Sequence, residues 1–297
     1  MRIAITGGAG FLGLASAMRL AGDGHEVQAL DISAPPARPD ITFRACDVAE
    51  MGDVTSAFSA FRPDIIVHLA ALLTLDAKAD IAAATRVNAL GTAHVFAAAL
   101  ETGAKRIVYA SSVAALGDAD TVPGDAAMAR PASVYGATKA FGEHLARAFA
   151  ADNPDLTLIG LRFGSVYGLG RARGWRAIQT LVEQAASGAG DLAFPDFREP
   201  IDWTWIGDAA EVTACAATAS LSGNHVFNVV GDKRLMREAA AHLATRFPGL
   251  RLAPQPDVTP PSAWSFANDG LQAALGYVPH TCMEDGIDAM LAAMPAR

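Results

Sequence analysis

The sequence predicts an α/β protein, a doubly wound parallel sheet with a smaller, interleaved C-terminal part. Short apolar runs alternate with segments of helical length up to about residue 164, and this repetition builds a parallel sheet. A turn rich in glycine follows the first apolar run, where sheets of this kind bind their ligands. Of the 297 residues 52% are hydrophobic and 18% are charged, which permits a large core and excludes a disordered chain.

The strands of the sheet are expected at the apolar runs Arg2–Thr6, Glu26–Leu30, Ile41–Ala45, Ile65–Leu69, Arg106–Ala110 and Thr157–Arg162. Helices are expected between them, among others at Leu12–Ala21 and Val87–Glu101. Right-handed crossovers bring the carboxyl ends of parallel strands to one edge of the sheet. Functional residues are therefore expected directly after the strands.

The turn after the first strand reads Thr6-Gly7-Gly8-Ala9-Gly10-Phe11-Leu12-Gly13. Gly7 allows a tight turn, Gly10 lets the backbone approach a pyrophosphate, and Gly13 lets the helix pack closely on the sheet. The free N–H groups at the helix start would then hold the anion. The spacing predicts a dinucleotide-binding turn of the Rossmann type.

The second expected strand is followed by Asp31, 24 positions after Gly7. A carboxylate at this place can accept hydrogen bonds from both hydroxyls of an adenosine ribose. It would repel a 2′-phosphate, so NAD is favoured over NADP, although Arg38 in the next loop weakens that preference.

After Gly164 the alternation ends, and an aromatic, proline-rich segment at Phe194–Trp205 has the composition of a lid over a substrate. Further elements are expected beyond that point: helices at Ala177–Ala186 and Leu235–Phe247, and a strand at His225–Val230. The expected domains are an NAD-binding Rossmann-type domain at 1–165, to which 202–232 return, and a smaller substrate-binding domain made of 166–201 and 233–297.

A candidate catalytic set consists of Ser112, Tyr135 and Lys139. Tyr135 and Lys139 share one face of an expected helix, and an ammonium near a phenol lowers the pKa of the phenol toward the working range. Ser112 follows the fifth expected strand and offers a hydroxyl that can polarise a carbonyl. Taken alone, the Tyr-Lys pair is equally consistent with an exposed helix start, and Ser112 favours the proton-relay interpretation.

Further motifs stand in order along the chain: Cys46-Asp47-Val48, His68-Leu69-Ala70-Ala71, Val87-Asn88-Ala89-Leu90-Gly91-Thr92, Arg162-Phe163-Gly164-Ser165-Val166-Tyr167-Gly168 and Asp202-Trp203-Thr204-Trp205. Together with the glycine turn, Asp31 and the Ser-Tyr-Lys set, they resemble the extended short-chain dehydrogenases/reductases, the NAD-dependent epimerase/dehydratase family. The resemblance continues to Leu275-Gly276-Tyr277 and so spans nearly the whole chain.

The resemblance implies roles for individual residues, beginning with Ser112, Tyr135 and Lys139 as the catalytic residues. It implies that NAD is bound by Gly7, Gly10, Phe11, Leu12, Gly13, Asp31, Asp47, Val48, Leu69, Ala70, Ala71, Asn88, Tyr135, Lys139 and Phe163. Residues Arg162–Val166 would lie near the nicotinamide and the substrate. The substrate is expected to contact Ser112, Tyr135, Ser165 and Arg173, and His68 is expected to be a packing residue rather than a metal ligand.

Two departures from the family pattern narrow the expected reaction. Val113-Ala114 stand where 4,6-dehydratases carry an Asp-Glu pair, so dehydration is disfavoured. Ile201 stands where sugar-nucleotide epimerases have an arginine that contacts the nucleotide of the substrate. Another arginine of the expected lid could make this contact instead: Arg171, Arg173, Arg176 or Arg198. We therefore expect NAD-linked hydride transfer at a secondary alcohol or ketone of a small, sugar-like substrate. The alternatives are an NAD-dependent (nucleotide-)sugar 4-epimerase and a non-catalytic NAD-binding regulator.

Charge and cysteine content limit the expected partners. The net charge is −8 without a block of Lys or Arg, which argues against nucleic acid and membrane surfaces. Cys46, Cys215 and Cys282 lack disulfide or metal-ligand spacing, so we expect no metal and a reducing cytoplasm. Neither a leader pattern nor a long uncharged apolar run is visible. A homodimer is expected through the helical faces Val87–Glu101 and Lys139–Ala151.

Overall fold

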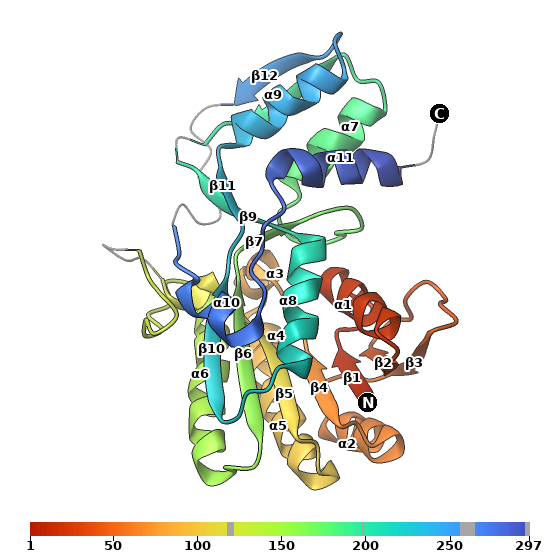
Figure 1. Cartoon of the computed structure of the whole chain (residues 1–297), viewed down its shortest axis with the longest axis vertical. Helices are drawn as coiled ribbons and strands as arrows, with labels where there is room; N and C mark the ends of the chain where they lie inside the picture. Colours follow the sequence, from red (N-terminus) through yellow and green to blue (C-terminus); the bar gives the residue numbers. More distant parts are fainter. Residues whose placement is uncertain (118–121, 198, 256–264, 295–297) are drawn as a thin grey trace.

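The computed structural model describes residues 1–117, 122–197, 199–255 and 265–294. Its centre is a seven-stranded sheet in the order β10-β6-β5-β4-β1-β2-β3, with every neighbouring pair parallel (Figure 1). The strands are β1 (Arg2–Thr6), β2 (Glu26–Asp31), β3 (Ile41–Ala45), β4 (Ile65–His68), β5 (Arg106–Ser112), β6 (Thr157–Phe163) and β10 (Asn224–Val229). The predicted fold class, a Rossmann-type doubly wound α/β sheet, is confirmed.

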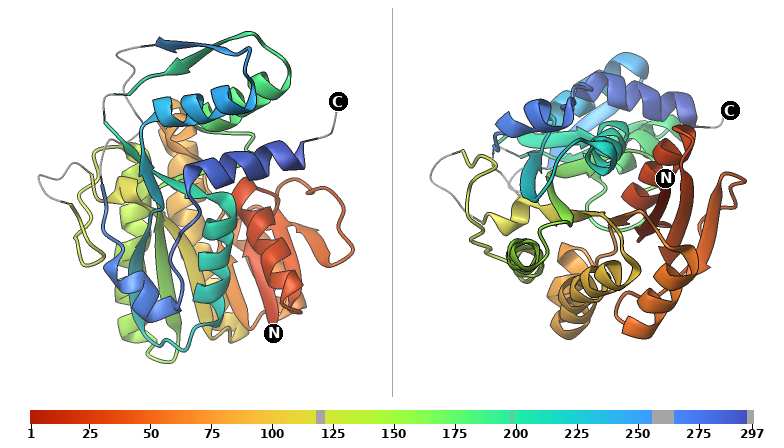
Figure 2. Two further views of the ribbon diagram at one scale, coloured as in Figure 1. Left: turned by 45° about the horizontal axis from the view of Figure 1, so that its top comes forward. Right: turned by 60° about the horizontal axis from the view of Figure 1, so that its bottom comes forward.

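Helices cover both faces of this sheet, as Figure 2 shows. Helices α1 (Phe11–Gly22) and α8 (Ile206–Thr218) lie on one face, whereas α2 (Met51–Phe61), α5 (Gly91–Thr102) and α6 (Val134–Asp152) lie on the other. Successive strand residues point to opposite faces of the sheet. Ile3 and Ile5 therefore belong to the core under α1 and α8, and Ala4 belongs to the core under α2, α5 and α6. Both faces are therefore apolar, as a parallel sheet requires.

The strand order reverses at β1, which pairs with β2 on one side and with β4 on the other. In a doubly wound sheet, ligands bind beyond the carboxyl ends of the strands at this reversal. The loops that follow β1 and β4 therefore frame the candidate site.

The helix expected at Val87–Glu101 is longer and less regular than predicted. Helices α3 (Thr74–Ala79) and α4 (Ile81–Ala84) lead into a π-helical stretch, η1 (Thr85–Leu90), which continues into α5. Such stretches often occur at functional sites, and this one contains Asn88.

Within the described residues, the smaller part has two small sheets and three helices. Its helices lie at the top of Figure 1, and strands β7 and β9 lie below them, toward the large sheet. The three-stranded sheet has the order β11-β9-β7, and the two-stranded sheet pairs β12 with β8. The strands are β7 (Ser165–Tyr167), β8 (Asp191–Pro195), β9 (Ile201–Trp205), β11 (Asp232–Arg234) and β12 (Arg251–Gln255). The helices are α7 (Ala177–Ala186), α9 (Met236–Arg246) and α11 (Met283–Ala293), and they enclose a core of their own.

Two segments lie differently from the predicted domain boundaries. Helix α10 (Asp269–Leu275) packs Leu271 and Leu275 into the core of the large sheet, although it follows residue 233. Trp203 of β9, inside the expected return to the first domain, belongs to the core of the smaller part. The two parts are more interleaved than the sequence pattern indicates, and the domain limits stay a prediction.

The aromatic segment expected as a lid is mostly interior. Phe194, Phe197 and Trp203 are only 4%, 1% and 2% exposed, and Trp175 stacks on Trp203 with ring centroids 4.9 Å apart. These rings form the core of the smaller part, because three of them lie on or beside paired strands.

Candidate active site

The glycine turn between β1 and α1 leaves no room for side chains on its inner side. Gly7 has a φ of +69°, and a Cβ built on it would lie 2.6 Å from the backbone nitrogen of Ala70. A Cβ on Gly13 would lie 1.9 Å from the carbonyl oxygen of Gly7. Gly10, directly before α1, has an extended conformation and is exposed. The turn therefore presents bare backbone at a helix N-terminus, the arrangement that binds phosphate.

Asp31 lies beside this turn at the end of β2. Its carboxylate accepts hydrogen bonds from the backbone nitrogens of Ala9, at 3.1 Å, and Ser33, at 3.4 Å. Each carboxylate oxygen has further lone pairs, and the side chain is only partly buried. Asp31 is thus held in one orientation and can still accept hydrogen bonds from a ligand.

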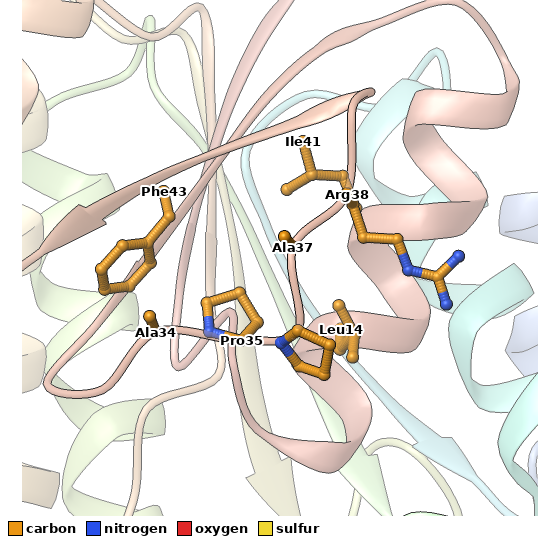
Figure 3. Close-up of a pocket in the computed structure, with 8 residues that line it drawn as sticks. Leu14, Ala34, Pro35, Ala37, Arg38, Ile41 and Phe43 are labelled. Carbon is orange, nitrogen blue, oxygen red and sulfur yellow. The ribbon is translucent and has the colours of Figure 1, made fainter.

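A pocket of about 260 Å³ lies behind the loop that follows Asp31 (Figure 3). Its lining is apolar except for Arg38, whose guanidinium points away from Ala34 and Phe43 in Figure 3. The pocket suits apolar packing rather than a phosphate group, so it adds no support for NADP.

Asn88 ties the loop after β4 to helix α6. Its side-chain oxygen accepts from the backbone nitrogen of Leu72 at 2.8 Å, and its Nδ2 donates to the oxygen of Leu72 at 3.0 Å and to Thr138 Oγ1 at 3.0 Å. The loop itself contains the predicted cofactor residues Leu69, Ala70 and Ala71. Asn88 therefore acts as a support for this loop rather than as an exposed ligand residue, because it is only 2% exposed.

The structure brings Ser112, Tyr135 and Lys139 together at the carboxyl edge of β5. Ser133 caps α6 by accepting a hydrogen bond from the backbone nitrogen of Gly136 at 3.0 Å, so Tyr135 lies in the first turn. The Ser112 side chain lies close enough to Tyr135 to act on the pKa of its hydroxyl. Lys139 Nζ donates to the carbonyl oxygen of Ala110 at 2.8 Å and lies 5.7 Å from the centroid of the Tyr135 ring.

The ionisation of this set differs from the sequence expectation. Burial raises the pKa of Tyr135, while the hydrogen bond from Ser112 and the charge of Arg171 act in the opposite direction. Lys139, expected to lower the pKa of the phenol, directs its ammonium to Ala110 and lies against the ring rather than at the hydroxyl. Burial lowers the pKa of Lys139 itself to about 8.

His68 is a buried packing residue, as expected. Its Nδ1 lies 2.7 Å from Thr6 Oγ1 and its Nε2 lies 3.0 Å from Thr92 Oγ1. Burial, helped by the charge of Lys139, lowers the pKa of His68 to about 3. The ring is therefore neutral at physiological pH, and both nitrogens are engaged.

The segment after β6 meets the prediction only in part. Phe163 is paired in register with Ser112, which places it beside the catalytic set. The guanidinium of Arg162 forms a buried ion pair with Glu143 at 2.8 Å, so it is already engaged within the protein. The expectation that Arg162 lies near the substrate stays a prediction. Ser165 begins β7 and is partly buried.

Loops after β3 and β7 hold the remaining predicted residues. Asp47 accepts a hydrogen bond from the backbone nitrogen of Ala49 at 2.9 Å, and Val48 packs against Gly91 of α5. Arg173, the predicted substrate residue, is exposed, whereas Arg171 is partly buried and acts electrostatically on Tyr135. The sequence contained no signal that separates these two arginines, and Arg198 lies outside the described residues.

A family model described as the NAD dependent epimerase/dehydratase family matches residues 3–230 of the chain. The chain belongs to this family. Family membership confirms the predicted resemblance, and it confirms that the protein is an enzyme of an NAD-dependent class. The roles of individual residues stay predictions.

Relatives of this epimerase/dehydratase family member differ in reaction. UDP-glucose 4-epimerase of Mycolicibacterium smegmatis is 27% identical, with 97% of this chain and 96% of the relative covered. Uronate dehydrogenase of Pseudomonas putida is 34% identical over 56% of this chain and 61% of the relative. Among solved structures, MoeE5 in complex with UDP-glucose and NAD has a TM-score of 0.86 at 27% identity, covering 98% of each chain.

The residues present fit NAD. The glycine turn exposes its backbone, and a Cβ at Gly7 or Gly13 would clash with neighbouring backbone atoms. Beside the turn, the Asp31 carboxylate can accept further hydrogen bonds from a ligand. Within the described ranges, no group of three or more His, Cys, Asp or Glu side chains is arranged to hold a metal ion. In the same part of the chain, no helix is both long and apolar enough to cross a bilayer.

Proposed function

We propose that this protein is an NAD-dependent oxidoreductase that transfers a hydride at a secondary alcohol or ketone of a small, polar, sugar-like substrate. One observation carries the proposal: Ser112, Tyr135 and Lys139 meet at the sheet edge that also presents the glycine turn and Asp31. The substrate class is supported by relatives such as uronate dehydrogenase and the L-arabinose 1-dehydrogenase (NAD(P)(+)) of Haloferax volcanii, 34% identical over 55% of this chain and 66% of the relative.

The residues proposed to hold NAD come from the loops after successive strands. The turn at Gly7, Gly10 and Gly13, with Phe11 and Leu12, would bind the pyrophosphate, and Asp31 the adenosine ribose. Further loop and strand-end residues proposed to contact NAD are Asp47, Val48, Leu69, Ala70, Ala71 and Phe163, and helix α6 adds Tyr135 and Lys139. Asn88 would contribute by supporting the loop after β4. Bound NAD would supply the acceptor or donor of the hydride.

The chain's own residues handle the proton. Tyr135 exchanges a proton with the substrate oxygen as general acid or base, and Ser112 orients that oxygen by a hydrogen bond. Lys139 lies one turn further along α6, where its ammonium can hold the cofactor ribose. Because burial raises the pKa of Tyr135, the phenol is protonated in the free protein. A positive charge near the Tyr135 hydroxyl would lower its pKa toward the pH at which the enzyme works.

A variant test separates catalysis from binding. With Tyr135→Phe we expect NADH formation from a panel of sugars and sugar acids to fall by roughly 10²- to 10⁴-fold, because the proton-transfer group is removed. Calorimetric affinity for NAD should remain close to wild type. If the variant kept full activity, the proton role would be wrong. If only NAD binding and no turnover were found for either protein, a non-catalytic NAD-binding regulator would replace the proposal.

A 4-epimerase is the second candidate, favoured by the near-complete coverage of UDP-glucose 4-epimerases among sequence and structural relatives. An epimerase oxidises and re-reduces its substrate on one retained cofactor. We therefore expect tightly bound NAD after purification and no net NADH on turnover if this candidate is right. Epimer formation from UDP-sugars, followed by chromatography, measures it directly.

We further infer a cytoplasmic homodimer. Leu90 of η1 and Phe141 of α6, two elements in contact with each other, are 46% and 43% exposed, which suits helix-to-helix contact with a second copy. Light scattering should give the mass of two chains, and Phe141→Glu should shift the protein toward the monomer. An unchanged mass in this variant would move the interface elsewhere.

A further inference from the structure

The two segments that carry Ser112 and Tyr135 are in direct backbone contact at Gly136. This residue is buried in the first turn of α6, and a Cβ built on it would lie 2.2 Å from the carbonyl oxygen of Ala114. A backbone carbonyl cannot turn aside as the end of a side chain can. Glycine at position 136 therefore lets α6 approach the residues after β5 more closely than any other residue would.

Each side of this contact is joined to one of the two hydroxyl residues. The backbone nitrogen of Ala114 donates to Ser112 Oγ at 3.1 Å. Gly136 follows Tyr135 directly, and its backbone nitrogen donates to Ser133 Oγ, the cap of the helix, at 3.0 Å. A change in the distance between the two backbones would therefore move Tyr135 relative to Ser112.

Two further contacts of α6 lie on the same face of the helix and are made by side chains. Lys139 Nζ donates to the oxygen of Ala110 at 2.8 Å, and Glu143 accepts a hydrogen bond from Ser111 Oγ at 2.5 Å. Positions 136, 139 and 143 share one helical face. Long side chains adjust to a small change of distance, whereas the contact at Gly136 joins backbone to backbone. The glycine contact therefore sets how near the first turn of α6 comes to β5.

A second glycine holds the same two segments together. A Cβ built on Gly117 would lie 1.7 Å from the carbonyl oxygen of Arg130, whose backbone nitrogen donates to the oxygen of Ala115 at 2.9 Å. The segment after Ser112 and the segment before Tyr135 are thus held against each other at two places by their backbones.

We propose that Gly136 is a positioning residue for the reaction, because its contact with Ala114 sets the separation of the Ser112 and Tyr135 hydroxyls. The inference rests on the proposed function, in which both hydroxyls act on one substrate oxygen and must therefore reach the same atom. Alanine at position 136 would push the two segments apart by roughly 1 Å, and a misplacement of this size costs on the order of 100-fold in rate.

Two glycine variants on the same helix test this role. For the substrate that the wild type converts, we expect Gly136→Ala to lower kcat by about 100-fold. Gly142→Ala is the matched control, because Gly142 is also buried in α6 and its Cβ would lie 3.8 Å from Thr92 Cγ2, an ordinary contact. It should keep kcat within about two-fold of wild type. Calorimetric NAD affinity should fall far less than kcat in Gly136→Ala, because the glycine turn and Asp31 are unchanged.

A double-mutant cycle separates positioning from a general loss of structure. Ser112→Ala removes the hydroxyl whose distance from Tyr135 is at issue. In that background, Gly136→Ala should lower kcat by less than about three-fold, because no Ser112 hydroxyl is left to misplace. An equal factor in both backgrounds overturns the inference.

Ser133→Ala is a milder variant, which decides the question if Gly136→Ala does not fold. It removes the cap from Gly136 without adding an atom, so the first turn of α6 is less firmly held. We expect kcat to fall by about three- to ten-fold. A kcat equal to that of wild type would overturn the inference in this case.

A measurement without turnover keeps the inference separate from the proposed function. The chain has four tyrosines, so labelling of tyrosine Cζ gives four NMR signals, and Tyr135→Phe identifies the signal of Tyr135. Ser112→Ala and Gly136→Ala should move this signal in the same direction, and Gly142→Ala should leave it in place. An unmoved signal in Gly136→Ala overturns the inference. Absence of NADH and epimer formation by the wild type, with the signal moved as expected, overturns the proposed function alone.

Discussion

Lys139 illustrates at the residue scale how the fold changes the chemistry of a side chain. The residue is 8% exposed, its ammonium donates to the Ala110 carbonyl, and burial lowers its pKa from 10.5 to about 8. This pKa shift corresponds to roughly 3 kcal/mol of free energy by which burial disfavours the charged form of Lys139. A lysine held in an environment that disfavours its charge is typical of functional sites.

The lowered pKa of Lys139 should be visible in the pH dependence of the free energy of unfolding. The folded protein releases the Lys139 proton before the unfolded chain does, so the unfolded chain binds more protons between the two pKa values. Stability therefore rises with pH in that window. Between about pH 7.5 and about pH 9.5 we expect urea unfolding to show wild type gaining about 2 kcal/mol relative to Lys139→Met. A constant difference between the two proteins would contradict the lowered pKa.

At the scale of elements, α6 is attached to the sheet by the buried Glu143–Arg162 pair. Both side chains are less than 10% exposed, and Ser111 donates to Glu143 Oε1 at 2.5 Å. Helix α6 also carries Tyr135 and Lys139. The Glu143–Arg162 ion pair therefore helps to fix the position of these two residues relative to the sheet. The family resemblance implied a place near the substrate for Arg162, and the sequence could not show that Glu143 lies opposite its guanidinium.

Removing one partner of the Glu143–Arg162 pair should lower the free energy of unfolding more than removing both partners. We expect Glu143→Met to lower the free energy of unfolding by about 3 to 5 kcal/mol, because Arg162 would be left buried and unpaired. The double variant Glu143→Met with Arg162→Met should recover most of that loss in urea denaturation. Equal destabilisation by the single and double variants would argue against an ion-pair role.

The glycine turn offers a second test at this scale. Gly13→Ala should lower NAD affinity by at least about ten-fold and destabilise the protein, because its Cβ would overlap the Gly7 carbonyl at 1.9 Å. Gly22→Ala is the matched control, since it lies in the same helix and a Cβ there has nothing within 4 Å. We expect it to be neutral or stabilising by about 0.5–1 kcal/mol. Calorimetry with NAD and thermal unfolding measure both.

For the whole molecule, Asp208 connects the C-terminal segment to α8. It accepts hydrogen bonds from Tyr277 Oη at 2.5 Å, from Thr281 Oγ1 at 3.0 Å, and from the backbone nitrogens of His280 and Thr281. The segment then enters α11, which packs in the smaller part. One buried carboxylate thus links the large sheet to the core of the smaller part.

Asp208→Ala should loosen this connection. Four donors would lose their acceptor, and we expect a loss of roughly 3 kcal/mol or more in the free energy of unfolding. Limited proteolysis should show faster cleavage near residues 277–283 than in wild type, while Asp208→Asn should be intermediate because it retains one acceptor oxygen. Unchanged cleavage in Asp208→Ala would show that packing alone holds the segment.

Four features could be predicted from the amino-acid sequence alone: the parallel sheet, the glycine turn, the position of Asp31 and the helical spacing of Tyr135 and Lys139. These features follow from local periodicity and from short-range backbone geometry, which neighbouring residues encode. Three features could not be predicted in this way: Arg171 rather than Arg173 lies near the ring of Phe11, Arg162 pairs with Glu143, and the aromatic segment is core. Each of those depends on contacts between segments far apart in the chain, where side-chain direction is set by the partner and not by the sequence spacing.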